Sequence, residues 1–305
     1  MPLTRRTFNF SALAVAAAAA QPSWMRSESL GFPLGLQLYT VREAIDTDTP
    51  LALKQVAEIG YREVETAGFG TLKTARELRR VLDDLGLKCP SAHLHFDLAN
   101  LSKAFDDAKA LGCTYATASV PRDIFYKPPP HQESAPLPGL LGAQIGMPAE
   151  QFPRMVEVLN QVGKAARSAG LRYASHNHSM EFSQIDGKTG YEYVIDNTDP
   201  EIVFFELDCG WASVAGQDPA AIMRRHPGRI KMLHLSDYKR KQSSIEAPKE
   251  SAEGVRAGTG ITNFAAIFSA ARESTIDYAF VEEATAAHPM EDAKSDREYL
   301  LGLAK

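Results

Sequence analysis

Two strongly apolar segments of the chain end abruptly in residues that could bind a metal ion. The segment PEIVFFELDCGW runs into Asp208, and the segment GRIKMLHLSDYK carries His234 near its end. A strand buried on both faces reads as a continuous apolar run, and polar groups at the carboxyl ends of parallel strands lie where such sheets place their chemistry. A carboxylate and an imidazole at such positions are suitable ligands for a divalent cation.

A third candidate ligand, Glu282, lies at the end of the last apolar segment, DYAFVEE. Because side chains alternate along a strand, Glu282 shares a face with Phe280, and Asp208 shares a face with Glu206. We therefore expect Asp208, His234 and Glu282 to converge. Such a set, rich in carboxylates with one imidazole, favours one divalent ion of Mn, Mg or Co, and Zn is also compatible. For a fourth ligand, the segment SHNHSMEF offers His176, His178 and Glu181.

Eight apolar segments alternate with amphipathic stretches along the chain, which predicts a (β/α)8 TIM barrel of the α/β class. A doubly wound sheet would need a glycine-rich phosphate turn after its first strand, and GLQLYTVREA has none. The strands are expected at residues 35–41, 61–68, 87–95, 114–120, 171–178, 201–208, 229–237 and 277–283. The helices are expected at residues 49–60, 75–86, 103–112, 152–170, 189–198, 218–228 and 263–276.

Size and composition favour one large domain over residues 30–305. The chain has 305 residues, of which 44% are hydrophobic, so it can bury a single barrel-sized core. Residues 121–153 are dense in Pro and Gly and are expected to form an irregular loop, either a cover over the substrate or a solvated insertion. The net charge of −5 gives no electrostatic case for a nucleic-acid partner.

The first 25 residues are expected to be a signal peptide rather than part of the fold. Arg5 and Arg6 precede two phenylalanines and an Ala-rich run that is too short to span a membrane comfortably. This segment resembles a twin-arginine export signal, which implies a periplasmic or exported protein without a stable membrane anchor after cleavage. The alternative is a frayed N-terminal helix. Homo-oligomerisation is left open by the sequence.

Five segments together resemble the sugar (phosphate) isomerase and epimerase superfamily, whose fold is the xylose isomerase-like barrel. They are GLQLYTVRE, HNHSMEF, ELDCGW followed by AGQDP, MLHLSD and FVEE. The resemblance covers essentially the whole chain after the signal segment. It implies that a Glu, an Asp, a His and a second Glu from strands five to eight hold one divalent ion that a sugar hydroxyl and carbonyl chelate. Asp208, His234 and Glu282 fall on three of those positions.

The chain departs from this pattern on strand five. Much of the superfamily has Glu directly before Asn-His, and this chain has His176 there. Either His176 replaces the carboxylate or Glu181 reaches back from beyond the strand. We prefer Glu181, because a carboxylate preserves both the hard ligands and a base. In addition, Trp211 stands where some sugar epimerases carry a His, and it is better suited to stacking on a sugar face.

The chemistry that this resemblance implies is removal of a proton next to a carbonyl. A metal would polarise the oxygen while two carboxylates, Glu181 and Glu282, remove the proton and return it. Substrate contacts are expected from polar residues at the strand ends, with the alternatives that a histidine is structural or a charged residue merely solvated. The expected substrate-binding residues are Glu65, His93, His176, His178, Trp211, Asp237 and Lys239.

The leading hypothesis is a metal-dependent isomerase or epimerase acting on a small-molecule sugar or keto-sugar through an enediolate. A lyase or hydratase acting on a 3-keto-glycoside would share the metal site and differ only after the enediolate has formed. A non-catalytic periplasmic sugar-binding barrel is a third hypothesis. A DNA-repair nuclease on the same barrel would need a cluster of metal ions and a basic surface, which the acidic composition disfavours.

Overall fold

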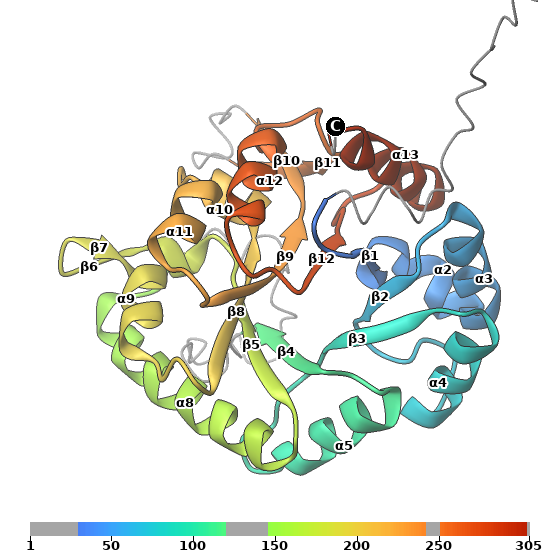
Figure 1. Cartoon of the computed structure of the whole chain (residues 1–305), viewed down its shortest axis with the longest axis horizontal. Coiled ribbons are helices and arrows are strands. Elements are labelled where there is room, and N and C mark those ends of the chain that lie inside the picture. Colours follow the sequence, from blue (N-terminus) through green and yellow to red (C-terminus); the bar gives the residue numbers. More distant parts are fainter. Residues whose placement is uncertain (1–29, 120–145, 242–250, 304–305) are drawn as a thin grey trace, which may run out of the picture.

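The computed structural model describes residues 30–119, 146–241 and 251–303. Its centre is a closed barrel of eight parallel strands in the order β1-β12-β9-β8-β5-β4-β3-β2, with the helices outside it (Figure 1). The barrel strands are β1 Leu34–Gln37, β2 Glu63–Thr66, β3 Lys88–His93, β4 Tyr115–Ser119, β5 Arg172–His176, β8 Val203–Asp208, β9 Ile230–Leu235 and β12 Tyr278–Val281. The predicted (β/α)8 barrel is therefore confirmed.

Helices follow the barrel strands, and each of the seven predicted helical ranges overlaps one of these helices. They are α2 Arg42–Thr47, α3 Thr49–Ile59, α4 Ala75–Asp84, α5 Leu101–Leu111, α8 Phe152–Ser168, α9 Gly190–Asn197, α10 Cys209–Val214, α11 Pro219–Arg225, α12 Phe264–Arg272 and α13 Pro289–Gly302. Short 3-10 turns are η1 Leu38–Val41, η2 Ala149–Gln151 and η3 Met180–Phe182. None of the helices within the described part of the chain is long and apolar enough to cross a membrane.

Three features of the fold were not predicted from the sequence. The first strand ends at Gln37 and continues as η1, helices α2, α10 and α13 are additional to the predicted ones, and two antiparallel hairpins lie outside the barrel. The hairpins pair β6 (Gln184–Ile185) with β7 (Lys188–Thr189), and β10 (Asp237–Lys241) with β11 (Ser251–Val255). The predicted signal segment and most of the predicted irregular loop 121–153 lie outside the described residues.

An apolar plug fills the middle of the barrel. Tyr115, Ala174, Met232 and Phe280 are all fully buried and pack together inside the ring of strands. Gly35 on β1 makes room for this plug, because a Cβ there would lie 2.7 Å from the Phe280 ring. The plug therefore lies between the polar side chains at the carboxyl-terminal mouth and the amino-terminal end of the barrel.

Two buried carboxyl groups lie where β12 meets α13. Asp296 is 1% exposed and accepts a hydrogen bond of 2.8 Å from the amide of Ala257. Burial, reinforced by nearby Asp292, raises the pKa of Asp296 to about 7 despite that hydrogen bond. Burial likewise raises the pKa of Glu283 to about 7. Unfolded carboxyl groups titrate near pH 4. The folded protein therefore binds more protons between about pH 4 and 7, and its stability falls as the pH rises through that window.

We expect Asp296→Asn to remove part of this pH dependence, because the amide keeps an oxygen for Ala257 but cannot ionise. The free energy of unfolding of the variant should exceed that of the wild type by about 1 kcal/mol or more at pH 8, and by less at pH 5. Urea unfolding at both pH values measures this. Glu298→Gln, an exposed change on the same helix, is the control, and a gain in Asp296→Asn that is equal at both pH values would contradict the assignment.

Candidate metal centre

The structure brings Asp208, His234 and Glu282 together at the carboxyl-terminal mouth of the barrel. Nδ1 of His234 lies 2.7 Å from Oε2 of Glu282 and 4.0 Å from Oδ2 of Asp208. Asp208 and His234 are fully buried, and the side chain of Glu282 is 15% exposed. Parallel pairing of β8 with β9 places Asp208 directly beside His234, so strand register alone fixes this contact. Whether these residues bind a metal ion stays a prediction.

Asp208 has one carboxylate oxygen engaged and one without a hydrogen bond. Oδ1 caps helix α10 by accepting from the amide of Trp211 at 2.7 Å, and it also accepts from the hydroxyl of Ser236 at 2.6 Å. Oδ2 has no hydrogen-bond partner among the described residues. Burial raises the pKa of Asp208 to about 6, with His176 opposing the rise. A buried carboxylate oxygen without a hydrogen-bond partner is suited to bind a metal ion.

The opposite edge of the His234 ring faces two more carboxylates. Nε2 lies 2.7 Å from Oε2 of Glu65 on β2 and 3.0 Å from Oε2 of Glu206 on β8. Glu65 also accepts hydrogen bonds from Gln37 and Ser91, so both of its oxygens are engaged. Burial opposes a charged imidazole, but the surrounding carboxylates outweigh burial and raise the pKa of His234 well above its ordinary value.

The two candidates for the strand-five ligand lie close to each other. His176 is 3% exposed, and its Nδ1 lies 3.2 Å from Oε2 of Glu206. Glu181, on η3, is 1% exposed, and its Oε2 accepts from the amide of His178 at 2.9 Å. Of the two, the structure groups His176 with Asp208 and His234 at ligand spacing. The preference for Glu181 stays a prediction.

The arrangement of donors fits one divalent cation. Within the described ranges, ligand atoms of His176, Asp208 and His234 lie within 4.8 Å of one another, as do those of Glu65, Glu206 and His234. These residues are buried, and carboxylate oxygens outnumber imidazole nitrogens among them. Repulsion among so many buried carboxylates is relieved by a cation. The ion would be held by Asp208, His234, Glu282 and a residue from the end of β5.

His93 also borders the cluster, but one of its ring nitrogens is already occupied. Nε2 accepts a hydrogen bond of 3.1 Å from the amide of Ser119. Burial, with His176 nearby, lowers the pKa of His93 to about 3, so the ring is neutral. Because a backbone amide only donates, the proton of the neutral His93 ring is on Nδ1. A neutral N–H donor at this position suits the predicted contact with a sugar hydroxyl.

The other predicted substrate contacts have varied surroundings. Trp211 is 5% exposed and packs against Tyr238 with ring centroids 4.4 Å apart. The ring of His178 lies 5.9 Å from that of Trp211. Asp237 is buried in a loop of backbone amides, and Lys239 is exposed on β10. Glu65 lies beneath His234 and is fully buried. None of these predicted substrate contacts is tested by the structure.

Sequence reasoning passed over two residues of this cluster. Glu206 shares a strand face with Asp208, and that alternation was the available signal for it. Asn177 has no such signal, and only the fold shows that its Oδ1 accepts from the amide of Asp208 at 3.0 Å. This contact ties the end of β5 to the end of β8.

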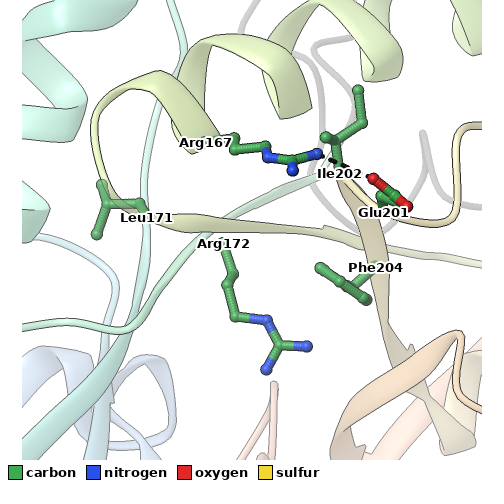
Figure 2. Close-up of a pocket in the computed structure, with 6 residues that line it drawn as sticks. All are labelled: Arg167, Leu171, Arg172, Glu201, Ile202 and Phe204. Carbon is green, nitrogen blue, oxygen red and sulfur yellow. Dashed lines mark hydrogen bonds and ion pairs between the residues drawn. The ribbon is translucent and has the colours of Figure 1, made fainter.

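A separate hollow of about 260 Å³ lies at the amino-terminal ends of β5 and β8 (Figure 2). Its two arginines are paired with carboxylates, since Arg167 lies 3.2 Å from Glu201 and Arg172 lies 2.8 Å from Asp277. TIM-barrel chemistry takes place at the other end of the barrel. We therefore place the functional site at the mouth and not in this hollow.

Comparisons with known proteins agree with the barrel fold. The family described as Xylose isomerase-like TIM barrel matches residues 53–303. An inosose dehydratase of Mesomycoplasma hyopneumoniae is 26% identical over 83% of this chain and 87% of its own length. Inosose dehydratase 2 of Bacillus cereus is 29% identical over 50% of this chain. The chain spans about half (54%) of the length of that relative. A solved sugar phosphate isomerase/epimerase from Parabacteroides distasonis is 25% identical, with a TM-score of 0.66 over 90% of this chain and 96% of that one.

We expect the purified protein to bind one divalent ion per chain and Asp208→Ala to lose most of that binding. Asp208 offers the free buried oxygen, so its removal should weaken affinity for Mn²⁺ by more than about a hundredfold, beyond the usual effect of residues that only support ligands. Elemental analysis after dialysis checks this. Asp296→Asn, which changes a buried aspartate outside the cluster, should keep the ion. A folded Asp208→Ala protein with one ion per chain would refute the assignment.

Proposed function

The chain belongs to the family of xylose isomerase-like TIM barrels, and from this premise we propose that it is a divalent-metal-dependent isomerase or epimerase of a sugar or keto-sugar. The observation that carries the proposal is the convergence of Asp208, His234 and Glu282 at the barrel mouth, with one oxygen of Asp208 free. Mn, Mg or Co is the proposed ion, with Zn as the alternative. The pair Arg5 and Arg6, followed by the Ala-rich run within residues 1–25, supports the further proposal of export to the periplasm.

The reaction would begin with removal of a proton next to the substrate carbonyl. A bound divalent ion supplies polarisation of that carbonyl and stabilises the negative charge that develops on its oxygen. The closed barrel and the apolar plug exclude water from below, so the charges act in a medium of low dielectric constant. The enediolate is then reprotonated on the same carbon in an epimerase, or on the neighbouring carbon in an isomerase.

Glu282 and Glu181 are the proposed bases. Burial disfavours the ionised form of Glu282, but the charge and hydrogen bond of His234 outweigh burial and lower its pKa, so it is ionised at neutral pH and can accept a proton. Glu282 comes from the eighth barrel strand and Glu181 from beyond the fifth. Carboxylates from well-separated strands can flank a substrate carbon, as removal and return of the proton require.

The loop after the seventh barrel strand indicates a substrate without a phosphate group. TIM barrels often bind phosphate with backbone amides of the loops after strands seven and eight. Here Oδ2 of Asp237 accepts from the amides of Gly258 and Gly260, at 2.9 and 2.8 Å, and Oδ1 accepts from the amide of Thr262 at 2.9 Å. The protein's own carboxylate therefore occupies the anion-binding amides. A neutral sugar or an oxidised glycoside is the proposed substrate.

A dehydratase or lyase is the second candidate, and the similarity to inosose dehydratases favours it. Both reactions start by removing the same proton. In the lyase the enediolate then expels a neighbouring hydroxyl or glycosidic group instead of being reprotonated, which requires a general acid near that group. The partly buried His178, beside Trp211 at the mouth, is a residue that could donate to such a group.

Replacing the bases should stop proton removal without emptying the metal site. Glu282→Gln keeps an oxygen that can bind the ion, and we expect turnover of a keto-sugar to fall at least about a hundredfold, the usual effect of losing a positioned general base. Incorporation of deuterium from heavy water into the substrate's carbon-bound position is the direct measurement. Glu283→Gln, next in sequence but on the opposite strand face, is the control. A Glu181→Gln, Glu282→Gln double variant that still turned over at the wild-type rate would refute the mechanism.

Phosphate esters should be poor substrates. Because Asp237 fills the loop amides and repels a second anion, we expect kcat/KM for a neutral keto-sugar to exceed that for its phosphate ester by about tenfold or more. Competition by inorganic phosphate in the same assay should be absent. A faster reaction with the phosphate ester would overturn the substrate proposal and leave the metal site untouched.

A further inference from the structure

Glu206 is a buried carboxylate that the proposed reaction does not use. It is fully buried on β8, and its Oε2 lies 3.2 Å from Nδ1 of His176 and 3.0 Å from Nε2 of His234. A single oxygen therefore contacts both imidazoles that could bind the ion. Its other oxygen, Oε1, has no hydrogen-bond partner among the described residues.

The backbone around Glu206 is adapted to this contact. Parallel pairing of β5 with β8 sets His176 directly opposite Glu206. The pairing of β8 with β9 shifts register between Phe205 and Glu206, so that the strand beyond this point aligns Asp208 with His234. A register shift of this kind re-aims side chains and recurs beside active sites. The same irregularity occurs between β2 and β3 just before Glu65, the other carboxylate on His234.

The hydrogen bonds to Glu206 decide which ring nitrogens carry protons. An ionised carboxylate only accepts, so a ring nitrogen that contacts it must bear a proton. Nδ1 of His176 and Nε2 of His234 are therefore the donors. The remaining nitrogens are Nε2 of His176 and Nδ1 of His234. Nδ1 of His234 contacts Glu282 at 2.7 Å, so it also carries a proton here and would release that proton on binding an ion.

We propose that Glu206 is a positioning residue whose one carboxylate oxygen accepts from both Nδ1 of His176 and Nε2 of His234, and thereby directs the other nitrogen of each ring to the metal centre. This inference rests on the proposed function. The contact with Glu206 also leaves Nε2 of His176 without a proton and able to bind the ion. Residues that orient metal-binding imidazoles in this way commonly raise metal affinity by a factor of about ten to a hundred.

A second ion held by His93, His176 and Glu206 is the competing interpretation, because their ligand atoms also lie within 4.8 Å of one another. Two contacts weigh against it. Nε2 of His93 is occupied by the amide of Ser119, and Nδ1 of His176 is occupied by Glu206 itself. His93 therefore has no free lone pair, and the one remaining lone pair of His176, on Nε2, is already assigned to the first ion. We therefore assign Glu206 to hold the imidazoles rather than to bind an ion.

The test compares Glu206→Gln with Glu65→Gln. Both remove a buried carboxylate from Nε2 of His234, but only Glu206 also contacts His176. We expect Glu206→Gln to weaken Mn²⁺ binding by about ten- to a hundredfold, measured by calorimetric titration, and Glu65→Gln to weaken it less. Circular dichroism confirms folding. If Glu206→Gln does not fold, Glu206→Asp keeps the charge but withdraws the oxygen, and the same loss is expected.

A spectroscopic readout separates this role from a structural one. In protein labelled with ¹⁵N-histidine, the metal-free wild type should show ring N–H signals of Nδ1 in His176 and Nε2 in His234 that exchange slowly with water, assigned through His176→Gln and His234→Gln. In Glu206→Gln the His176 signal should be lost or exchange markedly faster, whereas in Glu65→Gln it should persist.

The outcomes separate the two proposals. Wild-type Mn²⁺ affinity together with an unchanged His176 signal in Glu206→Gln would overturn the role of Glu206 and leave the proposed function standing. Protected ring protons in a wild-type protein that binds no divalent ion would refute the proposed function, while the hydrogen-bond assignment survives. Two ions per wild-type chain, with only one left in Glu206→Gln, would favour the competing interpretation and overturn this one.

Discussion

The contact on which the rest of the site depends is that of the buried His234 ring with four carboxylates. Glu65 and Glu206 face one ring nitrogen, and Glu282 and Asp208 face the other. Removing charged groups from water is costly, so such a cluster is stable only when its charges are paired and its hydrogen bonds are made. His234 contacts all four acids, but its single positive charge cannot balance them. A divalent ion bound to Nδ1 of His234 would supply positive charge beside Asp208 and Glu282 and would displace the Nδ1 proton. Metal binding would therefore be linked to proton release.

The barrel explains how this many acids can be held together. The strands contribute inward side chains, and the closed ring sets them at fixed heights. The plug of Tyr115, Ala174, Met232 and Phe280 seals the cluster from below. Smaller groups then adjust single atoms: Asn177 ties two strand ends together, and Ser236 engages the oxygen of Asp208 that also caps α10. Because Oδ1 of Asp208 accepts both of these hydrogen bonds, Oδ2 is left without a hydrogen-bond partner among the described residues.

The two proposed reactions use the same cluster and differ late in their course. In both proposals, proton removal depends on the ion and the carboxylates at the mouth, whereas the fate of the enediolate depends on which acid reaches the neighbouring carbon. The acid proposed for the lyase is His178, which is nearer solvent than the buried cluster. Asp237 occupies the amides of Gly258, Gly260 and Thr262, and on this contact rests the proposal that the substrate has no phosphate group. Reaction type and substrate choice are thus separable from metal binding.

The sequence by itself determined the barrel and the convergence of Asp208, His234 and Glu282, because a two-residue alternation and eight repeated units are local patterns. It also displayed Glu206 on the correct strand face. Only the tertiary structure decided what Glu206, Glu65 and Asn177 do, because they meet partners that lie 30, 169 and 31 positions away along the chain. Strand register and its shifts, which no local pattern encodes, set which ring nitrogen meets which oxygen. The same holds for Asp237, whose place among loop amides depends on how the β10-β11 hairpin folds back over the barrel end.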